Sequence, residues 1–321
     1  MTNTLLRIEQ LSIDLPGPAG PVRVVDDVSF TVSAGRTTGL IGESGSGKSM
    51  TATAIIGLLP AGAAVSGRIL WQDKDLVTMT EKERRRLRGH EIAMIFQDPQ
   101  AALDPTQTIG KQVGEILRRD RVSKSEVRRT VIELLDRVGI PDSQTRHAQY
   151  PHQYSGGLRQ RAMVATALAG KPQLILADEP TTALDVTVQA RILALLKRIR
   201  EEEGMAMLLV SHDLRVMAHV ADEVVVMYAG RLCEIGRGRE VLNRPAHPYT
   251  RALVVSVPAV RSKTAIAEPL PGSPANPAER PAGCPFHPRC AKAQNRCRTE
   301  VPRMRQIAGG RQVACHFPEE V

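Results

Sequence analysis

Short apolar runs alternate with longer segments of helical periodicity from the start of the chain to about residue 255. Residues 174–177 and 207–210 are continuously apolar, which is typical of strands covered on both faces. This alternation predicts an α/β fold with parallel strands at the centre of its sheet. The first strands follow one another without a helix between them, so we expect a small antiparallel piece at the edge of that sheet.

The periodicity also predicts where each element lies. We expect strands at residues 5–8, 28–32, 37–41, 92–96, 174–177, 207–210, 224–227 and 231–235. We expect helices at residues 48–58, 125–138, 158–169, 186–203 and 214–220.

The amino-acid composition changes after residue 258. Eight prolines fall within residues 258–288 and exclude a long helix or a central strand there. We therefore expect a main domain over residues 1–255 and a loop-rich, cysteine-rich extension over 256–321. The length of 321 residues agrees, at roughly 150 residues per domain. No apolar run approaches about 18 residues, and the N-terminus lacks the layout of a signal peptide, so neither a membrane span nor secretion is expected.

The net charge is +9, of which residues 256–321 carry +5, from ten Lys and Arg against five Asp and Glu. A basic segment can bind nucleic acid or anionic lipid, or it can simply be a solvated surface. The arginines here are scattered rather than blocked, which favours the solvated surface. Only 3% of the residues are aromatic, so a stacking platform for single strands is not expected either.

Residues 42–49, Gly-Glu-Ser-Gly-Ser-Gly-Lys-Ser, match the pattern G-x-x-x-x-G-K-[ST]. The glycines let backbone N–H groups surround phosphate oxygens, while Lys48 bridges the β and γ phosphates and the Ser49 hydroxyl binds Mg²⁺. A Gly-rich turn can match by chance, but here a strand precedes the segment and a helix follows it, as the motif requires. We therefore expect ATP or GTP to be bound by Gly42, Glu43, Ser44, Gly45, Ser46, Gly47, Lys48 and Ser49.

Two further segments carry candidate chemistry. The apolar strand at 174–177 leads into Asp178, suited to hold Mg²⁺, and Glu179, suited to polarise an attacking water. Residues Ser155, Gly156 and Gly157 directly precede a helical pattern. They can form a helix N-cap, which the spacing alone favours, or a second phosphate-binding end that meets a nucleotide held by a partner chain.

Taken in order, residues 42–49, Gln97, 155–157, 178–179, Ala183-Leu184-Asp185 and His212 resemble the motifs of an ABC transporter ATP-binding subunit. The resemblance covers residues 5–245 and implies the corresponding ATPase fold, with a helical subdomain at about 98–168. Two departures stand out: Leu158 replaces a common Gln in the signature, and no aromatic residue lies between Pro16 and Asp27 to stack on adenine. Arg23 is the residue in that stretch suited to stack instead.

The resemblance also implies a role for each matched residue. Glu179 corresponds to the catalytic base and His212 to the switch histidine that holds the γ-phosphate. Gln97 corresponds to the loop glutamine that senses the γ-phosphate and Mg²⁺, so the expected Mg²⁺ ligands are Ser49, Gln97 and Asp178. The Ser155-Gly-Gly segment corresponds to the signature that completes the partner's ATP site, and Asp185 to a residue of the dimer contact.

The sequences of residues 95–105, 181–190 and 247–253 are similar to the corresponding segments of the ATPases of dipeptide and oligopeptide importers. This implies import of peptides at the cytoplasmic face of the inner membrane, as a heterodimer with a second ATPase chain, two permease subunits and an external solute-binding protein. Nickel, glutathione and antimicrobial peptides stay open as solutes, because the same subfamily imports them. The rival class, a soluble ABC ATPase acting on DNA or ribosomes, has only the basic extension in its favour, and no nucleic-acid partner is expected.

The extension carries four cysteines, Cys284, Cys290, Cys297 and Cys315. Four thiolates can bind zinc or a [4Fe–4S] cluster, and free thiols or disulfides are the remaining possibilities. The gaps of five, six and seventeen residues are wider than those of zinc knuckles and favour the cluster. The family resemblance implies the cluster as well. Nearby His287 and His316 can substitute as ligands, although surface histidines are the favoured interpretation, and Cys233 is expected to be a small buried hydrophobe.

Overall fold

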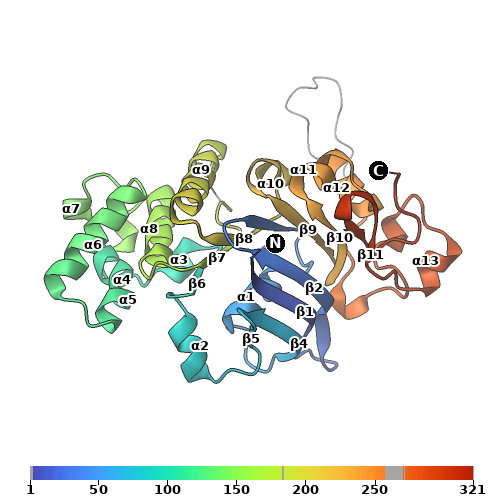
Figure 1. The fold of residues 1–321 in the computed structure, drawn as a ribbon, viewed down its shortest axis with the longest axis horizontal. Helices are drawn as coiled ribbons and strands as arrows, with labels where there is room; N and C mark the ends of the chain where they lie inside the picture. The colour runs from blue at the N-terminus through green and yellow to red at the C-terminus, as the bar shows by residue number, and fades with distance from the viewer. Residues whose placement is uncertain (1–2, 183, 257–269, 271, 321) are drawn as a thin grey trace. The chain divides into compact units, whose positions relative to one another are not determined.

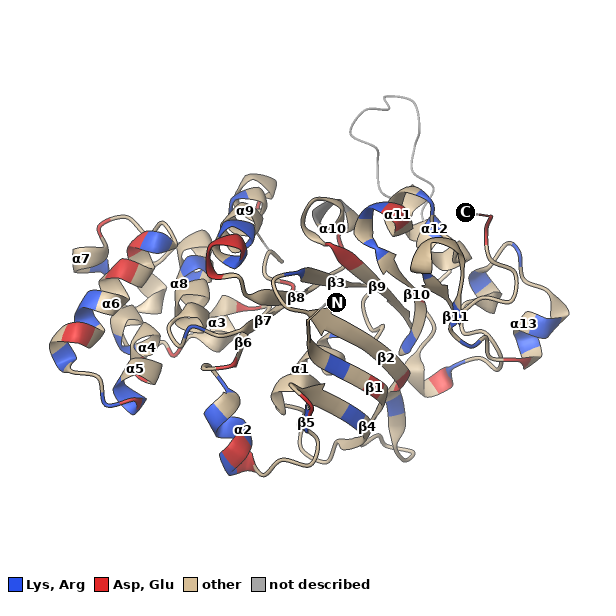
Figure 2. Ribbon diagram, in the orientation of Figure 1, with Lys and Arg blue, Asp and Glu red and all other residues tan. Residues whose placement is uncertain are grey.

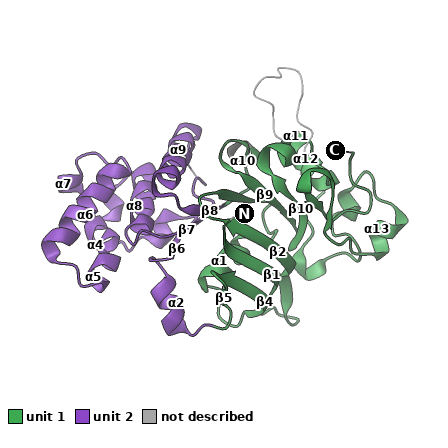
Figure 3. Ribbon diagram, in the orientation of Figure 1, with its two compact units in different colours: residues 1–78, 209–321 green, residues 79–208 purple. Residues whose placement is uncertain are grey.

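The computed structural model describes residues 3–182, 184–256, 270 and 272–320. The chain divides into two compact units (Figure 3). Unit 1 comprises residues 1–78 together with 209–321, and unit 2 comprises residues 79–208.

Unit 1 contains a separate antiparallel sheet in the strand order β2-β1-β4-β5 (Figure 1). Its strands are β1 (Thr4–Leu15), β2 (Val22–Ser33), β4 (Ala64–Trp71) and β5 (Lys74–Asp75). The antiparallel piece that the sequence predicts for the first strands is confirmed, but it forms a sheet of its own rather than an edge of the central sheet, because β4 pairs with the other side of β1. Inward side chains such as Leu6, Ile8 and Ile69 are almost fully buried, so this sheet has a core-facing side.

The second sheet of unit 1 carries the nucleotide-loop segment. β3 (Thr37–Ile41) pairs in parallel with β9 (Glu223–Tyr228), and β9 pairs antiparallel with β10 (Arg231–Arg237). The extension adds two short strands to it: β12 (Gln312–Val313) pairs with β10, and β11 (Arg305–Gln306) pairs with β12. The boundary predicted at 255/256 lies just before residues 257–269, which fall outside the described residues, and it stays a prediction.

The helices of unit 1 are short. They are α1 (Lys48–Ile56), α10 (Leu214–Val220), α11 (Gly238–Asn243), α12 (Pro248–Val255) and α13 (Asn295–Thr299). Single 3₁₀ turns lie at Pro277–Glu279, His287–Arg289 and Ala308–Gly310 in the extension. The frequent prolines of the extension explain why it has short turns instead of long helices, because each proline lacks a backbone N–H donor.

Unit 2 combines two parallel strands, β6 (Ile92–Ile95) and β7 (Leu174–Asp178), with a set of helices. The helices are α2 (Glu81–Leu87), α3 (Pro99–Ala102), α4 (Ile109–Val113), α5 (Glu115–Arg119), α6 (Lys124–Arg137), α7 (Ser143–Arg146), α8 (Gly156–Leu168) and α9 (Val186–Glu203), with a 3₁₀ turn at Pro151–Gln153. The strand β8 (Ala206–Ser211) then carries the chain into unit 1.

Basic and acidic residues lie close together on several helices (Figure 2), although α2 carries Arg84, Arg85 and Arg86 in succession and α9 ends in Glu201, Glu202 and Glu203. On α6, Arg129 lies 3.6 Å from Glu126 and 3.8 Å from Glu133, and beside α13 Arg296 pairs with Glu300 at 2.8 Å. Many cations of the surface are thus locally compensated. Within the described ranges, no helix combines the length and the apolar character that crossing a membrane requires.

Candidate active site

The loop after β3 closes tightly and leads into α1. The strand β3 is fully buried, and α1 begins at Lys48 after Gly47, whose φ of 98° lies in the left-handed region. A Cβ atom on Gly42 would lie 2.2 Å from the carbonyl oxygen of Met227 in β9. Glycine is therefore required at Gly42 by close approach and favoured at Gly47 by backbone conformation.

Lys48 is held inside this loop. Its Nζ donates to the carbonyl oxygens of Gly42 and Glu43, each at 2.8 Å, and to Ser46 Oγ at 3.3 Å. The side chain is buried, with 4% of the residue exposed. The loop is anchored from outside as well, because the N–H of Gly230 donates to the carbonyl oxygen of Ser46 at 3.0 Å. The motif predicts this arrangement for phosphate binding, with the lysine ammonium enclosed by the backbone of the loop at residues 42–49.

Two candidate catalytic residues of unit 2 are in direct contact. Gln97 follows β6 and Glu179 follows β7. Because β6 and β7 pair in parallel, their C-terminal ends lie at the same edge of the sheet. The Nε2 of Gln97 donates to Glu179 Oε2 at 3.1 Å, and the Thr182 hydroxyl donates to the same oxygen at 2.9 Å. Glu179 has a φ of 44°, and such strained backbone conformations are most frequent at functional sites. Asp178, the preceding residue, is buried at the end of β7.

The signature segment begins α8. Ser155 Oγ accepts a hydrogen bond from the N–H of Leu158 at 3.4 Å, so the N-cap interpretation is confirmed. Ser155 and Gly156 are exposed, and a Cβ on Gly157 would lie 3.1 Å from a methyl group of Val188 in α9. Gly157 therefore allows α8 to approach the start of α9 closely.

Asp185 begins the next helix. Its Oδ1 accepts from the N–H of Val188 at 2.9 Å and caps α9, while the residue is exposed. Ala183, matched in the same motif, lies outside the described residues. Capping orients the carboxylate at the helix N-terminus. The dimer contact of Asp185 stays a prediction.

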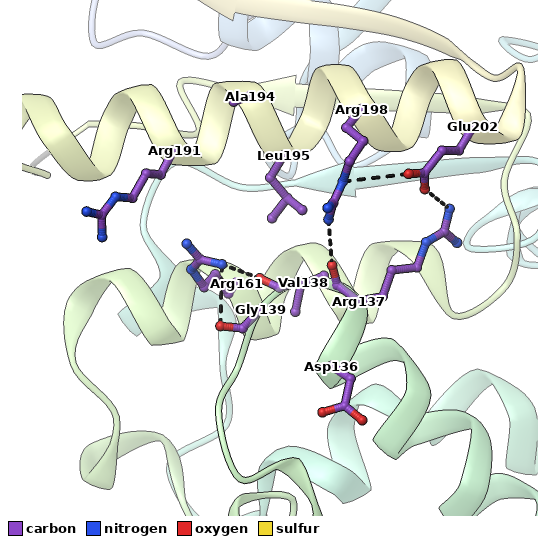
Figure 4. Close-up of a pocket in the computed structure, with 10 residues that line it drawn as sticks. All are labelled: Asp136, Arg137, Val138, Gly139, Arg161, Arg191, Ala194, Leu195, Arg198 and Glu202. Carbon is purple, nitrogen blue, oxygen red and sulfur yellow. Dashed lines mark hydrogen bonds and ion pairs between the residues drawn. The ribbon is translucent and has the colours of Figure 1, made fainter.

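A cavity of about 540 Å³ lies between the end of α6 and helices α8 and α9 (Figure 4). Arg161 of α8 reaches the carbonyl oxygens of Val138 and Gly139, and Arg198 of α9 donates to the carbonyl oxygen of Arg137 at 2.9 Å. Burial, with the neighbouring guanidinium groups of α9, lowers the pKa of Arg161. These contacts fasten the helix that Ser155 caps to the end of α6.

The remaining nucleotide candidates lie in unit 1. His212 follows β8 and is exposed. Arg23 forms a bidentate pair with Asp14, at 2.8 and 2.9 Å, which lowers the pKa of Asp14 and raises that of Arg23. The guanidinium edge of Arg23 is thus occupied, and its stacking on adenine stays a prediction.

The four cysteines of the extension line one small cavity, together with His247, His287 and His316. Burial, together with a smaller contribution from the neighbouring thiols, raises the pKa of Cys284 and of Cys315 to about 11. All five cysteines are free thiols in the structure, so none of them forms a disulfide. Across the described part of the chain, no three His, Cys, Asp or Glu side chains are arranged to hold a single metal ion.

His287 and His316 are half-buried and line the same cavity as the cysteines, so neither is the exposed surface histidine that the sequence favours. His287 Nδ1 lies 3.0 Å from the carbonyl oxygen of Cys284, and His316 Nε2 lies 3.0 Å from that of Glu300. Both imidazoles are thus placed to hydrogen-bond to the backbone. Cys233 is 6% exposed, which confirms the prediction of a small buried residue.

Two contacts were not predicted. The N–H of Glu43 donates to the Tyr249 hydroxyl at 2.9 Å, and the Glu43 carboxylate pairs with Arg289 of the extension. The only sequence signal was that Tyr249 lies in the family-like segment 247–253, to which no role was attached.

Comparison with known proteins gives matches over most of the chain. Residues 25–182 match the family model described as ABC transporter, and residues 233–297 match that of the oligopeptide/dipeptide transporter C-terminal region. The chain is 44% identical to the dipeptide transport ATP-binding protein DppD of Escherichia coli, covering 98% of this chain and 97% of that protein. It is 43% identical to the oligopeptide transport ATP-binding protein OppD of Salmonella typhimurium, covering 99% and 95%.

Solved structures show the same fold. The cbiO1 protein of Clostridium perfringens, part of the ABC transporter complex cbiONQ, is 26% identical with a TM-score of 0.65, covering 75% of this chain and 92% of that one. A dimeric ATP-binding cassette in a post-hydrolysis state, bound to ADP and Pi, is 26% identical with a TM-score of 0.66, covering 73% and 99%.

Proposed function

Because the chain belongs to the family of ATP-binding subunits of dipeptide and oligopeptide ABC transporters, we propose that it hydrolyses ATP to drive the import of di- or oligopeptides. The observation that carries the proposal is the extent of the likeness. It covers 98% of the chain and includes the C-terminal region at 233–297 as well as the ATPase segment at 25–182.

In the proposed cycle, the loop at 42–49 surrounds the ATP phosphates, and Lys48 neutralises the β and γ phosphates. Ser49, Gln97 and Asp178 would hold Mg²⁺, which when bound would supply positive charge beside the γ-phosphate. Two observations support these assignments: loop oxygens hold the buried Lys48 ammonium, and Asp178 is buried at the end of β7.

Glu179 acts as the base that accepts a proton from the attacking water, and His212 holds the γ-phosphate. The hydrogen bond from Gln97 to Glu179 supports this assignment, since it couples the base to the residue proposed to sense Mg²⁺. The strained backbone at Glu179 supports it too, because such strain is retained where a side chain must point in one direction.

The working unit is proposed to be a heterodimer of ATPase chains bound to two permease subunits at the cytoplasmic face of the membrane, fed by an external solute-binding protein. The exposed Ser155, Gly156 and Asp185 are available for a partner, and the signature would complete the ATP site of the other chain. Backbone amides and a hydroxyl at the start of α8 suit a terminal phosphate.

The function is tested with Glu179→Gln in cells whose own copy is replaced. The purified variant should bind ATP but hydrolyse it at least about a hundredfold more slowly, and the cells should lose uptake of labelled di- and tripeptides. Glu201→Gln is the matched control, since Glu201 is a carboxylate of α9 that is 53% exposed, and it should behave as wild type. Undiminished peptide uptake, or loss of nickel or glutathione uptake instead, contradicts the peptide assignment.

We also propose that Cys284, Cys290, Cys297 and Cys315 hold a [4Fe–4S] cluster. Four thiol donors that line one cavity are the ligand set of such clusters, and this lining supports the proposal. When bound, the cluster would supply a cross-link among four points of a segment that has little regular secondary structure.

Metal analysis of anaerobically purified protein tests the cluster. We expect about four iron and four acid-labile sulfide per chain, with visible absorption. Cys290→Ser should lose the iron, whereas Cys233→Ala, which changes a buried cysteine outside the proposed ligand set, should keep it. One zinc per chain, or no metal, contradicts the cluster and leaves the ATPase assignment standing.

A further inference from the structure

The C-terminal extension forms an ion pair with the nucleotide loop. Arg289 Nη1 and Nη2 lie 2.7 and 3.0 Å from the two carboxylate oxygens of Glu43, the second residue of the loop. The Arg289 side chain is 5% exposed and that of Glu43 is 21% exposed. The pair is bidentate and largely removed from water, which is the geometry in which an arginine–carboxylate pair is strongest.

Aromatic residues hold both partners in place. Arg289 Nη1 donates to the Tyr228 hydroxyl at 3.3 Å, and the guanidinium carbon lies 5.8 Å from the centre of the Tyr228 ring. The Tyr249 hydroxyl accepts from the N–H of Glu43. The rings of Tyr228, Tyr249 and Phe286 pack at centroid distances of 4.6 to 5.3 Å. Both the backbone and the side chain of Glu43 are therefore fixed from outside the loop.

The charge of Glu43 is unfavourable for the loop's own task. A carboxylate in a phosphate-binding loop repels the phosphates, and partial burial strengthens that repulsion. Arg289 compensates the charge and holds the carboxylate to itself. The carbonyl oxygen of Glu43 also accepts from Lys48 Nζ, so the position of Glu43 helps to place the ammonium.

We propose that Arg289 is a positioning residue for ATP binding, which makes the extension part of the nucleotide site. The inference rests on the proposed function only in that the loop at 42–49 binds ATP. Arg289 directly precedes Cys290, so the segment that carries the cysteines is the same one that sets the charge of the loop. Any change in the path of that segment is transmitted to Glu43 through the guanidinium.

Steady-state ATPase kinetics of the full chain test the proposal. Arg289→Ala should raise KM for ATP roughly tenfold, because a partly buried carboxylate is left uncompensated beside the phosphates. The value of kcat should stay within about twofold, since the proposed base lies elsewhere in the chain. Adding Glu43→Gln to Arg289→Ala should restore most of the affinity, because it removes the repelling charge. A merely structural role of Arg289 would instead lower Tm and reduce kcat together with the affinity, without a selective rise in KM.

Arg251→Ala is the matched control. It removes another arginine–carboxylate pair of unit 1, between Arg251 and Glu319 at 3.0 Å, and should leave KM within about twofold of wild type. Arg289→Lys, which keeps the charge and loses the bidentate geometry, should give an intermediate KM and serves if Arg289→Ala does not fold. An unchanged KM in a folded Arg289 variant, or a double variant as impaired as Arg289→Ala, overturns the proposal. Wild-type protein that neither binds nor hydrolyses ATP would instead overturn the proposed function.

Discussion

Two glycines of the nucleotide loop differ in why they must be glycine, and alanine at each separates the reasons. A Cβ on Gly45 meets nothing within 4 Å, so Gly45→Ala is opposed only by a φ of +76°. A Cβ on Gly42 would lie 2.2 Å from the Met227 carbonyl oxygen and 2.7 Å from Ser46 Oγ. The first substitution changes backbone preference, and the second also requires the loop or β9 to move.

The magnitudes follow from these contacts. Left-handed backbone at a residue with a side chain costs about 1–2 kcal/mol, which we expect for Gly45→Ala. A clash with backbone is added at Gly42, and overpacking in a tight site costs about 1–3 kcal/mol or more, so we expect a loss of about 3 kcal/mol or more for Gly42→Ala. With about 2–4 °C per kcal/mol for a unit of this size, Tm should fall by about 2–8 °C for Gly45→Ala and by about 6–12 °C for Gly42→Ala.

Thermal unfolding of nucleotide-free protein measures this difference, because it reports folding rather than ATP binding. Urea unfolding at 25 °C gives the same comparison as free energies of unfolding. If Gly42→Ala is as stable as Gly45→Ala, the close approach of Gly42 to Met227 does not limit the loop, and the reasoning from the clash is refuted.

Two further predictions concern buried charge and helix capping. Glu234 is fully buried, and its charge is compensated by Arg311, which is 4% exposed. Arg311→Ala should therefore lower the free energy of unfolding by about 3–5 kcal/mol in urea titrations, and adding Glu234→Gln should recover part of that loss. A loss below about 1 kcal/mol contradicts the stabilising role of the buried pair. Ser155→Asn preserves an N-cap residue and should leave Tm nearly unchanged, while Ser155→Ala should cost about 1 kcal/mol. If Ser155 also serves a partner's ATP, both variants should lose ATPase activity in the assembled transporter, and full activity of Ser155→Asn limits the residue to capping.

The parts of the site that the sequence predicted are those encoded by short segments. The strand β7, observed at Leu174–Asp178, follows from an uninterrupted apolar run, and α9 lies where it was predicted, at Val186–Glu203. The nucleotide loop is recognisable because its glycines, lysine and serine occupy fixed positions in eight consecutive residues. In each case the residues that determine the structure lie within one element and the segments directly before and after it.

Other elements were hidden by local ambiguity. The strand β4 (Ala64–Trp71) was missed because an apolar run beginning in α1 extends to its first residues, and Ser66, Gly67 and Arg68 interrupt its own alternation. Several helices of unit 2 are four or five residues long, too short to show a period of 3.6. The local signals that remain are single capping residues, such as Asp98 before α3 and Thr108 before α4.

The pairing of Arg289 with Glu43 could not be predicted, because 246 residues separate the partners and no local pattern links them. It depends on the path of the extension, which is fixed by β12 on β10 and by Arg311 against the buried Glu234. The strand β10 pairs with β9, and β9 pairs with β3, whose end begins the nucleotide loop. The extension is thus attached to the sheet that carries the loop and also contacts the loop itself. An extension held at only one end of this path could move without consequence for ATP, whereas one held at both must affect the loop when it changes.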